Sequence, residues 1–222
     1  MTFSVQEPVG QARNVDETIA EDVEFSLMVA LVDDVLDVDL SGAHIELVYQ
    51  HNPHVSRSGW QGSVFRDEAH AGLDFMARDE ATMPLLFVTL DAVSGRGLGI
   101  HRMIYDSAGP ADNVTWSEVF EMTNNDLREL FPTLTEAEIS TAKEATYDIA
   151  QRFFGDDVIV DITFGFHGDE VLELANFVGD SLPFTISTAN QLVEIFLLRG
   201  VNELSSLHTP FTDDEVAPLL SN

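Results

Sequence analysis

The residues best able to do chemistry in this sequence are aspartates that gather in one short stretch. Asp33, Asp34 and Asp37 have the spacing of a DDxxD motif, which on a helix places carboxylates on one face. Carboxylates arranged in this way bind magnesium, which in turn holds a diphosphate. The same residues also suit the solvated face of an acidic helix, because aspartate is abundant throughout the chain. Both interpretations stay open from the sequence.

The next residues overlap this stretch and resemble the first half of a calcium-binding loop. Asp37, Asp39 and Ser41 supply oxygens at alternate positions, and Gly42 follows where such a loop turns. The twelfth position, which should be a bidentate glutamate, is Val48. An ordinary turn that enters a strand explains the same residues. We therefore expect either a turn or a loose site for a divalent or monovalent cation at Asp37, Asp39 and Ser41, and no other cofactor.

Three histidines also lie close together in the sequence. His51 and His54 flank Pro53, and His44 precedes them by one strand length. A zinc site needs three or four convergent ligands, and proline prevents the helical spacing that would align two of these rings. The pattern favours a polar loop.

A glycine-rich segment joins two apolar runs. Gly95, Arg96 and Gly97 lie between residues 84–93 and residues 98–105, and both runs have the composition of strands. A phosphate-binding loop would have to open a helix, so that backbone N–H groups face the anion. The glycines therefore predict a hairpin turn, and Arg96 at its tip is a candidate partner contact.

Charge restricts the function more than any motif does. There are 39 acidic and 10 basic residues, and the net charge is −29. Binding to nucleic acid or to an anionic membrane requires clustered arginine and lysine, so neither is expected. Abundant aspartate, a single lysine (Lys143) and no cysteine are typical of halophilic proteins, whose surface repulsion is screened at molar salt. An ordinary acidic protein from a bacterium of high GC content is the rival interpretation. An acidic decoy of a nucleic-acid-binding protein is a further alternative.

No targeting or catalytic signature is visible. No apolar run reaches 18 residues, and the segment from Met1 to Pro8 lacks the basic start of a secretory signal. We expect a cytoplasmic or virion location. There is no G-x-S-x-G or H-E-x-x-H motif, so the sequence favours a protein that is not an enzyme.

The first half of the chain is expected to be rich in strands. Apolar and polar residues alternate from His44 to Tyr49, as in a half-buried strand. Residues 15–36 fit both a helix and a strand, and the four-residue recurrence of Ile19, Val23, Leu27, Leu31 and Val35 favours the helix.

The second half is expected to be mainly helical. Thr135 and Glu138 form a capping box, and Gly155 supplies a stop. Between them runs an apolar stripe of Ile139, Ala142, Thr146, Ile149 and Phe153. Residues 158–166 alternate as a strand does, and the apolar run 192–198, opened by Thr188 and Gln191, is expected to be a buried helix.

These patterns predict an α+β fold in which a β-rich N-terminal part precedes a mainly helical C-terminal part. The expected domains are residues 1–110 and 111–222, with the boundary in the turn-rich stretch 106–113, although the two could form one continuous domain. No internal repeat is visible.

Residues 114–155 resemble the helical opening of head-to-tail adaptor proteins of tailed viruses. The shared features are a short helix, the Phe131-Pro-Thr-Leu-Thr135 link, and an amphipathic helix that ends in an aromatic residue and Gly155. The resemblance implies helices that pack side by side in a ring between portal and tail. Adaptors are mainly helical, whereas here about 110 β-rich residues come first, so another particle component fits nearly as well.

The sequence therefore favours a non-enzymatic structural or assembly protein of a halophile, such as a virion connector, that forms homo-oligomers or binds neighbouring proteins. A metal-binding protein or enzyme that uses the Asp33–Asp39 carboxylates is the alternative. The candidate interaction residues are Arg96, Ile139, Ile149, Phe153, Leu192 and Phe196.

Overall fold

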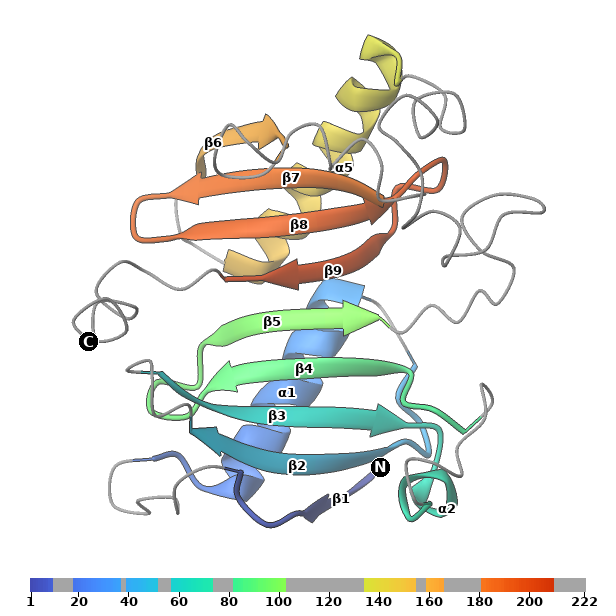
Figure 1. Cartoon of the computed structure of the whole chain (residues 1–222), viewed down its shortest axis with the longest axis vertical. Coiled ribbons are helices and arrows are strands. Elements are labelled where there is room, and N and C mark those ends of the chain that lie inside the picture. The colour runs from blue at the N-terminus through green and yellow to red at the C-terminus, as the bar shows by residue number, and fades with distance from the viewer. Residues whose placement is uncertain are drawn as a thin grey trace, which may run out of the picture. The chain divides into compact units, whose positions relative to one another are not determined.

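The computed structural model describes residues 1–9, 18–36, 39–51, 57–73, 82–102, 134–154, 159–165 and 181–209. The chain forms two compact units. Unit 1 comprises Met1–Met103 together with His208–Asn222, and unit 2 comprises Ile104–Leu207. Each unit contains a sheet with a long helix on one face (Figure 1). The expected domain boundary at 106–113 lies outside the described residues. No helix in the described ranges is both long and apolar enough to cross a membrane.

Unit 1 is a five-stranded sheet whose strands follow one another in sequence order. The first strand is parallel to the second, and every later neighbour in this unit is antiparallel. A hairpin therefore joins the two apolar runs that flank Arg96, as predicted. The elements are β1 (Thr2–Val5), α1 (Glu21–Leu36), β2 (His44–His51), β3 (Ser58–Phe65), α2 (Glu68–Ala71), β4 (Leu86–Asp91) and β5 (Gly97–Arg102).

Helix α1 covers one face of this sheet and contacts β2 to β5 (Figure 1). The prediction of a helix over most of residues 15–36 is confirmed, but the buried face of the helix is displaced by about one residue from the predicted apolar face. Met28 and Val32 are fully buried, whereas Val23 and Leu27 are 46% and 37% exposed. Against α1 the strands present alternate apolar side chains, as β2 shows with Ile45, Leu47 and Tyr49.

Unit 2 repeats this arrangement of one helix and consecutive strands. In spatial order its strands run β9-β8-β7-β6, and neighbouring strands are antiparallel (Figure 1). The long helix contacts β6, β7 and β8. The elements are α5 (Glu136–Phe154), β6 (Ile159–Phe164), β7 (Ser181–Thr188), β8 (Leu192–Leu198) and β9 (Leu204–His208), the last residue of which belongs to unit 1.

The prediction of a mainly helical C-terminal part is wrong. Four strands and one helix form the described part of this half, and residues 192–198 are strand β8 rather than a buried helix. Val193, Ile195 and Leu197 are fully buried, while Leu192 and Phe196, on the other face, are half-buried. A strand that is covered on one face and partly covered on the other has the continuous apolar sequence that a buried helix also has.

The helix start assigned to Thr188 and Gln191 is a hairpin turn. The N–H of Thr188 donates to the carbonyl of Gln191 at 2.9 Å, and the N–H of Gln191 donates to Thr188 Oγ1 at 3.1 Å. A threonine hydroxyl that accepts a hydrogen bond from the N–H three residues later occurs in helix caps and in turns alike. The local pattern therefore could not separate the two structures.

Helix α5 agrees with its prediction. The capping box is formed, and Ala142, Thr146 and Ile149 from the predicted stripe are buried together with Ala150 and Phe154. Among the described residues, the two units thus share an order that the sequence does not reveal, a long helix followed by four strands, with the short helix α2 between β3 and β4 in unit 1. The order of helices and strands depends on the spacing of apolar residues. Two segments with unrelated sequences can have the same spacing, so no sequence repeat is visible.

Candidate functional site

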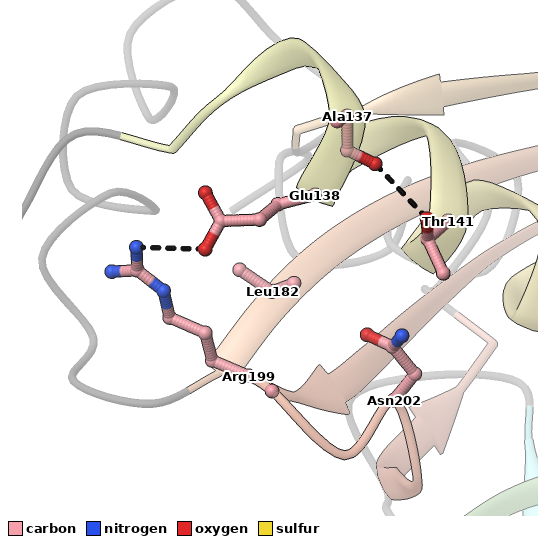
Figure 2. Close-up of a pocket in the computed structure, with 7 residues that line it drawn as sticks. Ala137, Glu138, Thr141, Leu182, Arg199 and Asn202 are labelled. Atoms are coloured by element: carbon pink, nitrogen blue, oxygen red, sulfur yellow. Dashed lines mark hydrogen bonds and ion pairs between the residues drawn. The ribbon is translucent and has the colours of Figure 1, made fainter.

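A hollow in unit 2 lies between the first turn of α5 and the turn that joins β8 to β9 (Figure 2). The volume of this hollow is about 280 Å³. One apolar side chain from β7, several polar groups and the backbone of the turn form its walls. The lining residues are Ala137, Glu138, Thr141, Leu182, Arg199, Gly200 and Asn202.

The β8–β9 turn has the backbone geometry needed to bring Arg199 to the hollow. Gly200 has φ of 85° and Asn202 has φ of 56°, both in the left-handed region, which glycine and asparagine tolerate best. The N–H of Asn202 donates to the carbonyl of Leu198 at 2.8 Å, and the N–H of Leu198 donates to the carbonyl of Glu203 at the same distance. The turn is therefore closed on both sides.

Glu138 connects this turn to the start of α5. One carboxylate oxygen accepts from the N–H of Thr135 at 2.7 Å and from its hydroxyl at 2.9 Å. The other oxygen accepts from Arg199 Nη2 at 3.3 Å (Figure 2). These hydrogen bonds, from the Thr135 backbone first, then its hydroxyl and then Arg199, lower the pKa of Glu138. A carboxylate held ionised in this way is poorly suited to donate a proton near neutral pH.

Asp33 and Asp34 are exposed near the end of α1, and Asp39 lies in the turn just before β2. The N–H of Ser41 donates to Asp39 Oδ1 at 2.8 Å, and Gly42 has φ of 80°. Hydrogen bonds from the Ser41 side chain and backbone lower the pKa of Asp39. Asp37 lies outside the described residues. Within the described residues, no three histidine, aspartate or glutamate side chains gather closely enough to hold a metal ion.

Arg96 is exposed at the β4–β5 turn, where the sequence placed it. Asp91 shapes this turn, since its Oδ1 accepts from the N–H and the hydroxyl of Ser94 at 2.8 and 2.7 Å. Gly95 has φ of 69° and lies against Leu27 of α1. The arginine is thus presented by a well-anchored turn.

The other predicted interaction residues lie in unit 2. Ile149 is 5% exposed and packs in the core of its own unit, and Ile139 and Phe153, on the same helix, are half-buried. Leu192 and Phe196 are half-buried on β8. The resemblance placed such helical residues against neighbouring subunits, whereas here the sheet of unit 2 covers the main stripe of α5.

The histidines make separate polar contacts. His44 is 4% exposed, with Thr2 Oγ1 2.8 Å from its Nδ1 and Ser4 Oγ 2.9 Å from its Nε2. His51 bonds to Ser58 at 2.7 Å, and His54 lies outside the described residues. Sequence reasoning missed the His44 cluster, because residues 40 positions apart meet only through the parallel pairing of β1 with β2.

Two further histidines have neighbours that change local ionisation. Asp67 is the N-cap of α2. Its carboxylate accepts from the backbone N–H of His70 at 3.0 Å and lies 2.6 Å from the Nδ1 atom of the His70 ring. These hydrogen bonds lower the pKa of Asp67. Burial and then the neighbouring His208 lower the pKa of His101. All four of these residues belong to unit 1.

Comparisons with known proteins add little. No family model matches the chain, and no curated protein matches it. A solved structure described as the Bacillus megaterium YpeB C-terminal domain has a TM-score of 0.41 and 10% sequence identity, covering 93% of this chain and 67% of that one. A likeness this distant carries no conclusion about fold or function.

Proposed function

We propose that this chain is a non-enzymatic structural or assembly protein that works in a salt-rich medium as part of a homo-oligomer or a larger particle. Its acidic surface keeps it hydrated and dispersed in salt. Its role is to hold neighbouring subunits in place, and the two helix-on-sheet units are the rigid parts on which contact surfaces are built.

One observation carries the proposal, namely that three carboxylates are hydrogen-bonded to the backbone of turns and helix starts. Asp39 accepts from the N–H of Ser41, Asp67 from the N–H of His70 and Glu138 from the N–H of Thr135, at 2.8, 3.0 and 2.7 Å. Hydrogen bonds from these residues also lower the pKa of each carboxyl group. These contacts support a role of the three carboxylates in shaping the backbone.

The narrower role of a head-to-tail connector stays a prediction. It rests on the resemblance of residues 114–155, of which 134–154 lie in the described ranges. The halophilic source likewise rests on composition.

The experiment is mass measurement by light scattering across a wide range of protein concentration, in about 2 M KCl, where the Debye length is only a few ångströms. We expect an oligomer whose mass exceeds one chain. Melting temperature measured in the same buffer series should rise with salt, because a net charge of −29 repels itself in dilute buffer. A chain that stays monomeric at every concentration would overturn the proposal.

A further inference from the structure

Strand β1 is the edge strand of the unit 1 sheet, and its apolar side chains are exposed. Met1 is 49% exposed, Phe3 37% and Val5 46%, and Val9 just beyond the strand is 58% exposed. Eleven large hydrophobic side chains are exposed among the described residues, and these are four of them. A concentration of this kind marks an interaction surface.

The backbone of β1 is also ready to accept another strand. The N–H of Thr2 donates to the carbonyl of Ala43, just before β2, at 3.1 Å. The N–H of Gln6 donates to the carbonyl of Leu47 in β2 at 2.8 Å. Because successive residues of a strand point their N–H groups to opposite sides, those of Phe3 and Val5 point away from β2. Within the described part of the chain, no hydrogen bond to these two groups is found.

The charge pattern indicates which strand fits this edge. Met1 to Gln6 carry no charged side chain, although the chain contains 39 acids. Edge strands are normally protected by charges, and this one has none until Glu7, which Pro8 follows. A basic partner would be recognised through acids, whereas a second copy with the same charge of −29 can approach closely only where acids are absent.

We propose that β1 pairs antiparallel with β1 of a second copy across a two-fold axis. This interface rests on the proposed assembly function and gives that function a defined contact. With the axis at Phe3, Phe3 faces its equivalent, and Met1 faces Val5 of the copy. Glu7 then lies beyond the paired residues. Thr2 and Ser4 point to the opposite face of the sheet, where they bind His44.

Two structural features make the pairing specific. The Phe3 ring stacks on Phe25 of α1, with centroids 4.6 Å apart and planes at 24°, so its position is set before a partner arrives. Pro8 lacks an N–H and ends the edge that can pair, which limits the contact to a short segment. An isologous contact of this kind closes as a dimer rather than extending as a fibre.

The experiment compares the unmodified chain with Val5→Lys and Val5→Pro variants by light scattering in about 2 M KCl, where surface charges are screened. Lysine replaces the apolar contact between Val5 and Met1 of the copy with a charge that would have to be buried, and proline removes an outward N–H without touching the β1–β2 hydrogen bonds. Val93→Lys is the matched control, because Val93 is 63% exposed on the β4–β5 turn. Circular dichroism checks that each variant is folded.

We expect both Val5 variants to raise the dissociation constant of the dimer about tenfold or more, which is the effect of losing one buried aliphatic contact. The Val93 variant should match the unmodified chain. An oligomer that is equally stable in all four proteins would overturn the β1 interface and leave the assembly proposal standing. An unmodified chain that is monomeric throughout would overturn both.

Discussion

The contact between β3 and α1 predicts a measurable effect of one added methyl group. A Cβ atom on Gly62 would lie 2.5 Å from Met28 Sδ and 3.1 Å from Ile45 Cγ2. Met28 and Ile45 are both completely buried, so neither side chain can move into solvent. Overpacking of a well-packed core costs about 1–3 kcal/mol. We expect Gly62→Ala to be destabilised by that amount.

The assay is thermal unfolding at constant salt. For a chain of this size, 1 kcal/mol corresponds to about 2–4 °C, so Gly62→Ala should melt about 2–12 °C lower. Gly72→Ala is the matched control, because its new Cβ would meet nothing closer than the Glu68 carbonyl at 3.7 Å, and φ there is −69°. The control should stay within about 0.5 kcal/mol of the unmodified chain.

A second background tests the cause. Met28→Val removes the atom that the new methyl group would strike, so most of the cost of Gly62→Ala should disappear in that background. The reasoning is refuted if Gly62→Ala melts with the unmodified chain. It is equally refuted if the cost is the same in both backgrounds.

Three further predictions concern ionisation and metal binding. Because the pKa of Glu138 is lowered from an ordinary 4.5, its stabilising effect is present above that pH and lost below it, so the difference in urea midpoint between the unmodified chain and Glu138→Gln should shrink on acidification. His101 should titrate below 6.5 in an NMR experiment, and His208→Gln should raise its pKa, because a neighbouring charge is removed. Calorimetric titration with Mg²⁺ or Ca²⁺ should give no saturable heat, since hydrogen bonds from Ser41 occupy Asp39; saturable binding that Asp37→Ala abolishes would instead support the metal hypothesis.

Two threonines show how far local patterns predict this fold. Thr135 and Thr188 are each followed three residues later by Glu or Gln, and both hydroxyls accept a backbone N–H at that spacing. After Thr135 come alanines and charged residues, which favour a helix. After Thr188 comes the run Leu192–Leu198, in which the leucines and Glu194 favour a helix and Val193, Ile195 and Phe196 favour a strand. The residues after Thr135 therefore support a helix, whereas neither the cap nor the run after Thr188 separates a helix from a strand.

The contact at the unit 2 hollow was not predictable. Glu138 was assigned to a helix cap from its spacing to Thr135, and that assignment is confirmed. Its second bond goes to Arg199, 61 residues away. No local sequence pattern connects these two side chains, because their contact depends on which strands become neighbours in unit 2.

The order of the units along the chain has a consequence for biosynthesis. Unit 2 is continuous, whereas unit 1 is completed by residues that follow it. Arg57 Nη1 donates to the carbonyl of Thr209 at 3.0 Å, and the N–H of Thr209 donates to the carbonyl of Leu98 at 2.7 Å. A ribosome releases all of unit 2 before Thr209, so unit 1 waits without these two bonds while unit 2 is being made. The first unit to be synthesised is therefore the last to close.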